Sequence, residues 1–367
     1  MTDPTIAADD PDHARFRATR HFGSLDGLRA FSILAVLWHH GLSRQGEVEG
    51  LASRGYHGVG LFFAISGFLI STLLLRERES RGRIDFRAFF MRRALRIFPL
   101  YYAVLLAHVV LVPLVHGDDP RGALFFENLP RHAVYLSNWC ENDSFGHAWS
   151  LACEEQFYLV WPWVLILLAG WRPLAGVLGL WATKFAVARA VEARDLDPDG
   201  FLVRLLANVP DAILAGIVAA FLLHGGRSHR ICRVVLGARV APLLAGVLVV
   251  LVLASRWHDE SYAILPVAFA ILVASVVIRE DHLARPLLGA PPLRHLGRVS
   301  YGVYLVHIMV LAAVARGAGE FLPPASAGRF AVALGASWLV AAISFRWFER
   351  PFLELKSRFR PRGRVAA

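Results

Sequence analysis

Arg29 and His40 are the first pair of residues in this sequence whose types and spacing could do chemistry. Ten residues separate them in an otherwise apolar segment, so in an α-helix they lie almost three turns and about 16 Å apart, on one face. An imidazole can serve as a general base or accept an acyl group, and a guanidinium can bind a developing negative charge. His39 lies about 80° off that face, so His40 is the predicted working histidine. The alternative is that Arg29 and the histidines only anchor the helix at the two membrane interfaces.

Glu154 and Glu155 begin a second apolar segment. Adjacent side chains of a helix point about 100° apart, so one of the two carboxylates can face a given partner. A carboxylate beside an imidazole orients it and raises its basicity, and we expect one glutamate to act in this way on His40. The alternative is a structural ion pair with an arginine such as Arg29 or Arg93.

Arg93 and Arg96 are three residues apart and share one face of a predicted helix. A guanidinium matches the geometry of phosphate oxygens, so this pair could dock the phosphates of a cytosolic cofactor. The alternative is an ordinary basic cluster at the cytoplasmic membrane surface, and spacing alone leaves both open.

Two further polar features lie inside apolar segments. Asp211 is a lone intramembrane carboxylate, for which a functional and a packing role are equally open. Ser300, Tyr304 and His307 recur at helical spacing and form a polar stripe that could be a hydrogen-bonded packing seam.

Composition places the chain in a membrane. Its 367 residues are 56% hydrophobic, and the mean hydropathy is +0.48. The net charge of +10 suits the basic cytoplasmic loops of a polytopic protein, so we do not expect nucleic-acid binding. The three cysteines show no metal-ligand or disulfide spacing, so no metal site is predicted.

Ten apolar stretches predict ten membrane-spanning helices. Arginines concentrate in the connections 76–96 and 225–239 and in the C-terminal tail, while the alternate connections hold few. The positive-inside rule then puts both termini in the cytoplasm, with the protein in the cell membrane. The predicted spans are 24–42, 58–75, 95–115, 149–170, 174–190, 205–224, 240–255, 262–279, 299–316 and 328–346.

The predicted organisation is one transmembrane domain, residues 22–352, of the all-α class. Residues 1–21 are predicted to be a disordered cytoplasmic tail with no cleaved signal peptide, and residues 353–367 a basic cytoplasmic tail. The longest connection, 116–148, is the predicted outer lid.

Together these segments resemble the acyltransferase-3 family of integral-membrane acyltransferases. The segment Leu-Asp-Gly-Leu-Arg, ten further residues and His40 match the family's Arg-x10-His signature. Each remaining motif is short, but all occur in the family's order between residues 22 and 352. They are Phe-Phe-x-x-Ser-Gly-Phe-Leu-Ile at 62–70, Arg93-x-x-Arg96 before Pro99, Trp-Ser-Leu-x-x-Glu-Glu-Gln-Phe-Tyr at 149–158, Ser-Tyr-x-x-Tyr-Leu-x-His at 300–307 and Glu-Arg-Pro-Phe at 349–352.

The resemblance implies an O-acyltransferase that takes an acyl group, usually acetyl, from cytosolic acyl-CoA and transfers it to a hydroxyl of a glycan or small molecule. Arg29 and His40 match the family's essential pair, and Arg93 and Arg96 match its proposed CoA contact. No permanently bound cofactor is implied. Some relatives carry a fused SGNH-type hydrolase domain after the last span; since this sequence ends soon after Pro351, we expect a protein that acts alone or passes its acyl group to a partner. The oligomeric state is open.

Two other classes of function remain to be weighed. A transporter or flippase for a lipid-linked sugar would use the same ionisable residues as a proton relay, but it predicts a pseudo-symmetry between halves that the sequence does not show. A non-catalytic scaffold in contact with membrane lipids does not explain so many costly polar residues on helix faces.

Overall fold

The computed structural model describes residues 10–43, 50–116, 120–141, 143–255, 261–317, 321–323 and 326–359. All regular structure in these ranges is helical, which confirms the predicted all-α class. The chain divides into two compact units. Unit 1 comprises residues 1–39, 43–82 and 163–298, and unit 2 comprises residues 40–42, 83–162 and 299–367.

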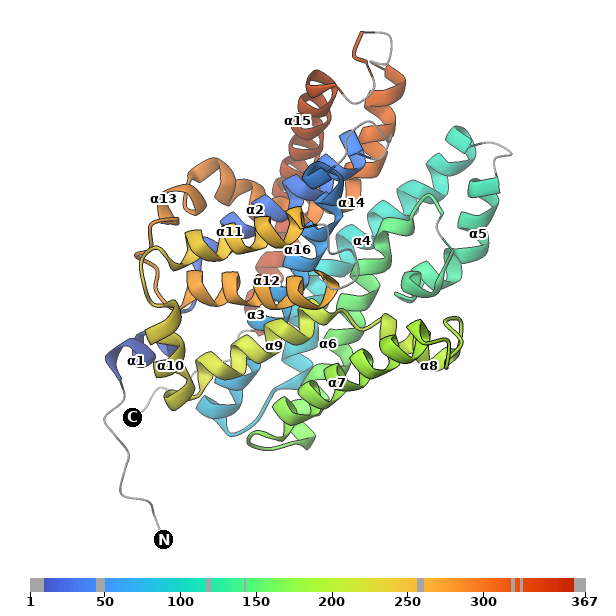
Figure 1. The fold of residues 1–367 in the computed structure, drawn as a ribbon. Coiled ribbons are helices and arrows are strands. Elements are labelled where there is room, and N and C mark those ends of the chain that lie inside the picture. Colours follow the sequence, from blue (N-terminus) through green and yellow to red (C-terminus); the bar gives the residue numbers. More distant parts are fainter. Residues whose placement is uncertain are drawn as a thin grey trace. The chain divides into compact units, whose positions relative to one another are not determined.

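Unit 1 is built on helices α3, α9, α12 and α11, which pack in that order, each against the next. Figure 1 shows α9, α12 and α11 side by side. The helices of this unit are α1 (Pro11–Ala18), α2 (Gly23–Trp38), η2 (Gly50–His57), α3 (Gly58–Arg81), α7 (Arg172–Glu192), α8 (Phe201–Ala207), α9 (Asp211–His224), α10 (Gly226–Leu236), α11 (Ala241–Ala254), α12 (Ser261–Val277) and α13 (Arg285–Leu288).

Unit 2 contains the long helix α4, which is followed by the shorter α5 and by two 3-10 turns before α6. Helices α6 and α14 begin or end in unit 1, so each unit holds part of them. The helices of this unit are η1 (His39–Ser43), α4 (Phe86–His116), α5 (Pro120–Ala133), η3 (Ser137–Trp139), η4 (Gly146–Ala148), α6 (Trp149–Leu167), α14 (Pro291–Gly317), α15 (Ala327–Ser344), η5 (Phe345–Glu349), α16 (Arg350–Leu355) and η6 (Lys356–Phe359).

Every one of the ten predicted spans coincides with a helix, but not all of these helices meet the requirements of a membrane span by themselves. Among the described residues, five helices are long and apolar enough to cross a membrane, and seven spans result if two bent pairs each count as one. The bends are 53° between α8 and α9 and 78° between α10 and α11. A polytopic membrane protein follows, and the number ten remains a prediction.

The N-terminal tail corrects one prediction. Residues 11–18, expected to be disordered, form helix α1, whose start is capped by the side chain of Asp10. The helix buries Phe16 within unit 1, and Arg76 of α3 donates hydrogen bonds of 2.6 Å to the carbonyls of Phe16 and Thr19. Eight residues with little apolar periodicity gave no sequence signal for this helix. Residues 1–9 and 360–367 of the predicted tails lie outside the described residues.

Arginines also bind the carboxyl ends of other helices in unit 1. Arg54 donates to the carbonyls of Leu253 and Ser255 at the end of α11. Arg78 donates to the carbonyls of Leu165 and Leu168 at the end of α6. The last carbonyls of a helix lack intrahelical partners and carry partial negative charge, so a guanidinium is a suitable cap.

Inside unit 1, the lone carboxylate Asp211 has a partner. The Lys184 ammonium lies 3.0 Å from the Asp211 carboxylate and also donates to the carbonyl of Val209. Lys184 lies within the fifth predicted span, 174–190. Asp211 begins α9, where the chain bends after Pro210. The pair gives Asp211 a packing role in holding α7 to the bend.

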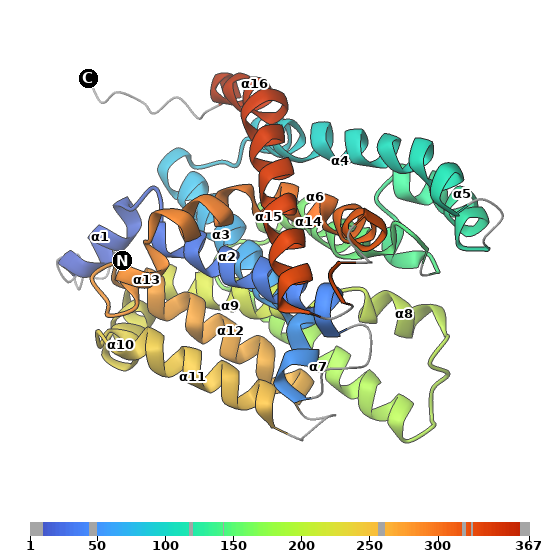
Figure 2. The same ribbon diagram turned by 90° about the horizontal axis from the view of Figure 1, so that it is seen from above.

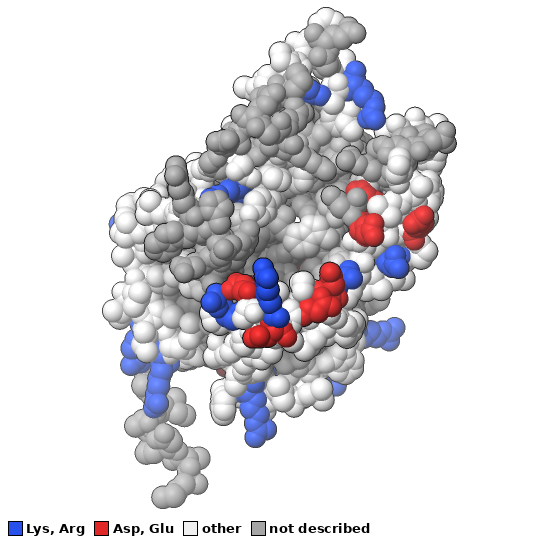
Figure 3. Space-filling view, turned by 45° about the vertical axis from the view of Figure 1, so that its right-hand side comes forward, with Lys and Arg blue, Asp and Glu red and all other residues white. Residues whose placement is uncertain are grey.

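Charged side chains occupy a small part of the face that Figure 3 shows. In Figure 3 most of the described surface is white, and red and blue side chains gather in a few patches. One acidic stretch is the connection between α7 and α8, in which Glu192, Asp195, Asp197 and Asp199 are all exposed. Helix α11, by contrast, exposes large apolar side chains, as expected for a surface that faces lipid. These are Leu243, Leu244, Val247, Leu248, Val250 and Leu251.

Glycines set the closest approach in unit 1. A Cβ at Gly67 of α3 would overlap the backbone of Ile213, and one at Gly216 of α9 would overlap the carbonyl of Ala64. Small residues at such crossings are the usual means by which membrane helices reach close contact.

We expect Gly67→Ala and Gly216→Ala each to destabilise the protein by about 1–3 kcal/mol, because the overlapping atoms are backbone and cannot rotate away. The measurement is the thermal unfolding midpoint in detergent. Gly176→Ala in α7 is the matched control, since a Cβ there has no neighbour within 4 Å. A midpoint of Gly67→Ala equal to that of the control would contradict the role assigned to this crossing.

Candidate active site

The two histidines that follow α2 lie in a π-helical turn. Helix α2 ends at Trp38, and η1 continues the chain from His39 to Ser43. A π-helical turn closes i→i+5 hydrogen bonds and is common at functional sites. Because it is wider than an α-helical turn, the helical-face argument that predicted the direction of His40 does not extend through it.

His39 and His40 have different surroundings. The Nδ1 of His39 is 3.0 Å from the carbonyl of Ser53 in unit 1, and its ring packs on Tyr56 with centroids 5.4 Å apart. His40 belongs to unit 2, where its Nδ1 lies 3.3 Å from Nε2 of His307 and the two ring centroids are 4.9 Å apart. The structure therefore pairs the histidine of the Arg-x10-His spacing with a residue 267 positions later.

Hydrogen bonding assigns the protons of both rings. Nδ1 of His307 is 2.5 Å from the carbonyl of Tyr304. A carbonyl only accepts, so Nδ1 of His307 carries the proton and its Nε2 presents a lone pair. Nδ1 of His40 then donates to that lone pair, which places the basic lone pair of His40 on its own Nε2.

A third imidazole, His147, packs against His307 with centroids 5.4 Å apart. Its Nε2 donates to the carbonyl of Leu305 at 3.2 Å. Burial and the nearby imidazoles of His307 and His108 hold the pKa of His147 well below its ordinary value. His147 is therefore neutral at physiological pH.

Tyr304 links this histidine cluster to α6. Its hydroxyl donates to the carbonyl of His147 at 2.7 Å and accepts from the hydroxyl of Ser150 at 2.6 Å. Because its carbonyl also accepts from His307, Tyr304 connects α14, η4 and α6 in one hydrogen-bonded group. Of the predicted polar stripe, Tyr304 and His307 thus form a hydrogen-bonded seam that also contacts His40, and Ser300 is buried.

The structure brings Glu154 close to Arg93 through Tyr158. The hydroxyl of Tyr158 donates to Glu154, one turn earlier on α6. The guanidinium carbon of Arg93 lies 5.0 Å from the centroid of the same ring. A cation over a tyrosine ring is stabilised by the ring quadrupole. Glu155 interacts electrostatically with Arg93 and Glu154. The role of either glutamate in orienting a histidine remains a prediction.

Arg96 faces a different carboxylate. It interacts electrostatically with Glu349 of η5, whose Oε1 lies 3.4 Å from the hydroxyl of Ser344. Glu349 is buried, so a nearby cation offsets much of the cost of its charge. Arg93 and Arg96 thus each have an acidic neighbour within unit 2.

Arg29 lies in unit 1, where its guanidinium is 3.5 Å from the carboxylate of Asp26. Asp26 is buried at the first turn of α2, a position that favours a negative charge. Asp26 is the aspartate of the Leu-Asp-Gly-Leu-Arg motif, and the sequence alone predicted no role for it.

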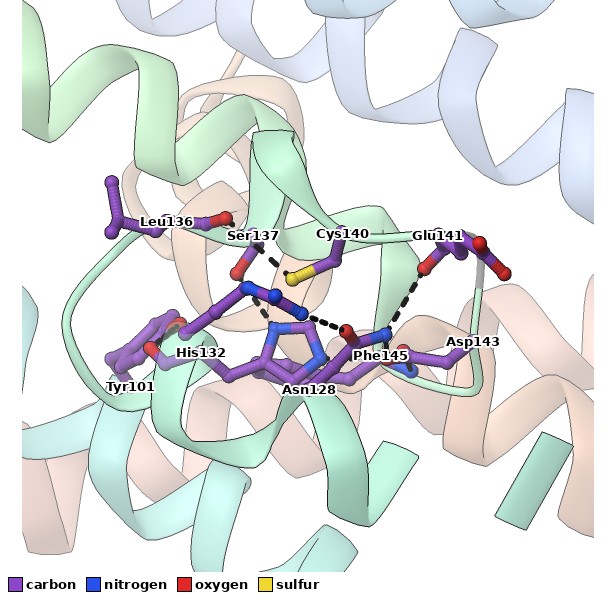
Figure 4. Close-up of polar contacts among 10 residues, drawn as sticks. Tyr101, Asn128, His132, Leu136, Ser137, Cys140, Glu141, Asp143 and Phe145 are labelled. Atoms are coloured by element: carbon purple, nitrogen blue, oxygen red, sulfur yellow. Dashed lines mark hydrogen bonds and ion pairs between the residues drawn. The ribbon is translucent and has the colours of Figure 1, made fainter. Parts of the chain in front are cut away.

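The connection predicted as an outer lid is ordered around His132 of α5, as Figure 4 shows. His132 lies between two polar groups, with Nε2 2.8 Å from Asp143 and Nδ1 2.8 Å from the hydroxyl of Ser137. Asp143 also accepts from the side-chain amide of Asn128 at 2.9 Å. Ser137 is only 3% exposed and His132 is fully buried, so this Ser-His-Asp arrangement lies inside the described part of the connection and holds it together.

The same carboxylate positions the histidine cluster. Asp143 accepts from the backbone N–H of Phe145 at 2.7 Å. The buried Phe145 ring packs on His108, with centroids 4.6 Å apart, and on His147, with centroids 5.2 Å apart. His132 and Asp143 therefore act on His147 through Phe145. No local sequence pattern marks this arrangement. The His147-x-x-Ser150 spacing shows only that the two residues lie on either side of the first residue of α6.

The fold and the site define a class of protein: an all-helical membrane protein with a hydrogen-bonded pair of histidines. The family model described as an acyltransferase domain (acyltransferase-3) matches residues 22–345. The chain belongs to this family, as the sequence motifs predicted.

Curated relatives are O-acetyltransferases by name. The chain is 28% identical to the peptidoglycan O-acetyltransferase OatA of Listeria monocytogenes, over 90% of this chain and 56% of the relative. It is 30% identical to the putative peptidoglycan O-acetyltransferase YrhL of Bacillus subtilis, over 80% of this chain and 49% of the relative. A putative O-acetyltransferase of Staphylococcus aureus (strain COL) is 26% identical, over 92% and 58%. The chain spans about half the length of these relatives. No solved structure matches the chain.

We expect Asp143→Asn to destabilise the outer connection by about 1–3 kcal/mol, because the buried His132 loses a charged acceptor. Limited proteolysis of the purified protein should then cleave residues 120–148 faster than in the wild type. Glu141→Gln is the matched control, since Glu141 is exposed two positions away. Unchanged cleavage of Asp143→Asn would show that the connection does not depend on this contact.

Proposed function

We propose that this protein is a membrane O-acetyltransferase that takes the acetyl group of cytosolic acetyl-CoA and transfers it to a hydroxyl of an extracytoplasmic glycan. Family membership supports acyl transfer. The names of the relatives favour acetyl as the acyl group and peptidoglycan as the glycan. A small-molecule hydroxyl is the alternative acceptor. The observation that carries the proposal is the hydrogen bond between His40 and His307.

The chemistry follows from the proton positions. In the direct route, Nε2 of His40 takes the proton of the acceptor hydroxyl, whose oxygen attacks the thioester carbonyl. The C–S bond breaks, and the imidazolium returns the proton to the thiolate of CoA. In the covalent route, Nε2 itself attacks the carbonyl, the C–S bond breaks and CoA leaves as its thiolate. The acceptor oxygen then attacks the acyl carbon, the C–N bond breaks, and the hydroxyl proton passes through water to the thiolate. In both routes His307 accepts from Nδ1 of His40 and so keeps Nε2 basic.

The other predicted site residues keep their proposed roles. Arg29 binds the thioester oxygen or the pantetheine arm, Arg93 and Arg96 bind phosphates of CoA, and Glu154 or Glu155 orients a histidine. Arg93 lies over the ring of Tyr158, and Arg96 interacts electrostatically with Glu349, so each guanidinium has a defined neighbour within unit 2.

The proposed location is the cell membrane, with both termini in the cytoplasm and membrane lipids around the bundle. Contacts in unit 1 join residues that the prediction places on the same side of the membrane. Arg54 caps the end of α11, and both lie on the predicted outer side. Arg78 caps the end of α6, and both lie on the predicted cytoplasmic side. Lys184 and Asp211, which form an ion pair, also fall in the same predicted half of the bilayer.

We expect His40→Ala to lower transfer from radioactive acetyl-CoA at least about 100-fold, because the general base or acyl acceptor is lost. The assay uses the purified protein in detergent with and without acceptor. Label retained by the wild type without acceptor and absent from His40→Ala identifies the covalent route. His39→Gln is the matched control, since the neighbouring ring bonds to Ser53 in unit 1. Normal activity of a folded His40→Ala would refute the assignment.

We expect His307→Phe to lower kcat about 10-fold or more at nearly constant KM, because the ring that accepts from His40 is replaced by one without a lone pair. His307→Gln keeps an acceptor at the end of its side chain and should recover part of the loss. Equal losses in the two variants, together with lower unfolding midpoints, would indicate that His307 is only a packing residue.

A further inference from the structure

A buried carboxylate at the start of α2 gathers two guanidinium groups and one imidazole. Asp26, whose side chain is 4% exposed, lies 3.3 Å from Nε2 of His21, 3.5 Å from Arg29 and 3.6 Å from Arg298 at the beginning of α14. All four residues belong to unit 1. Two permanent cations and one imidazole therefore lie around Asp26, and the imidazole of His21 also interacts electrostatically with Glu280.

Close backbone contacts hold these groups in place. A Cβ at Gly297 would overlap the carbonyl of Asp26, and a Cβ at Gly27 would overlap the carbonyl of Leu288. Helix α13 lies against α2, as Figure 2 shows. The first turns of α2 and α14 therefore meet backbone to backbone, and neither helix can shift without losing this contact.

The ion pairs around Asp26 are longer than the 2.7–2.9 Å of tight charge-assisted hydrogen bonds. Among the described residues, the buried Oδ2 of Asp26 has no hydrogen-bond partner. A network that served only to join the two helices would be expected to close to hydrogen-bonding distance. The side chain of Arg298 is 52% exposed, so part of its guanidinium faces outward.

A further cation extends the group. Arg294 precedes Arg298 by four residues, so the two share a face of α14. The Nε of Arg294 is buried and has no hydrogen-bond partner in the described structure. Arg294 lies in the first turn of α14, where the helix dipole disfavours a positive charge and favours an anion.

We propose that Arg298 and Arg294 form a binding site for a phosphate group, with Asp26 as the carboxylate that holds Arg298 in position. Guanidinium groups match phosphate oxygens by paired N–H donors, and an excess of cations over carboxylates leaves the cluster with net positive charge. Two sources of phosphate are available at a membrane: the phosphates of the acyl donor and the headgroup of an anionic lipid. In the first case the inference rests on the proposed function, and it adds a donor contact beyond Arg93 and Arg96.

The test is a binding titration of the purified chain in nanodiscs of zwitterionic lipid. The probes are CoA, 3′-dephospho-CoA, inorganic pyrophosphate and phosphate-free S-acetylpantetheine. The variants are Arg298→Gln and Arg298→Lys, with Arg227→Gln as the control, since Arg227 is an exposed arginine of α10 in the same unit. A second set of nanodiscs contains anionic phosphatidylglycerol.

We expect Arg298→Gln to bind CoA and pyrophosphate about 10-fold more weakly than wild type and to bind S-acetylpantetheine equally well. Arg298→Lys should lie between, because an ammonium keeps the charge without the paired donors. A larger loss for CoA than for 3′-dephospho-CoA assigns the site to the 3′-phosphate. Competition by phosphatidylglycerol that disappears in Arg298→Gln, with CoA affinity unchanged, assigns the phosphate to lipid.

Two outcomes separate the failure of this inference from the failure of the proposed function. If wild type binds CoA and Arg298→Gln binds CoA, pyrophosphate and phosphatidylglycerol equally well, the phosphate site is refuted and the donor stands. If wild type binds pyrophosphate through Arg298 but does not bind CoA, the phosphate site stands and the acyl-CoA donor is refuted.

Discussion

One backbone carbonyl, that of Tyr304, determines the chemistry available to the histidine pair. By accepting from Nδ1 of His307, it leaves Nε2 of that ring as an acceptor for His40. Two other groups of hydrogen bonds in unit 2 keep this geometry in place. The Tyr304 hydroxyl joins η4 to α6, and Asp143 holds Phe145 against His147. In a low-dielectric interior such bonds are costly to break, so the protonation pattern is built into the fold.

Unit 1 shows the same constraint in a different form. A membrane bundle has to satisfy its helix ends and its charges internally. Arginines do this at the carboxyl ends of α1, α6 and α11, and Lys184 does it for Asp211. Some of the many arginines of the chain therefore have a structural role, in addition to the role in membrane orientation that the sequence predicts. Around Asp26 the described arginines outnumber the carboxylates, and we infer a ligand there.

The helices could be predicted from the sequence because the length and apolar composition of a segment are local properties that indicate a helix in a membrane. The sequence missed α1, whose eight residues bury only two side chains, and it missed the π-helical turn, which no residue type specifies. For the site, it selected His40 but expected a glutamate as its neighbour. The His307 partner lies 267 residues away, a distance over which spacing carries no information. The contact of Glu154 with Tyr158 was within reach, since the two are four residues apart on one helix.

The wide turn η1 has a consequence for how this helix can change. A π-helical turn amounts to one extra residue accommodated within an α-helix. Deleting His39, the first residue of the turn, would rotate His40 by about 100° about the helix axis. His40 would turn away from α14, while the hydrophobic content of the segment would hardly differ. Membrane insertion of this segment therefore does not require the turn, whereas the position of His40 does.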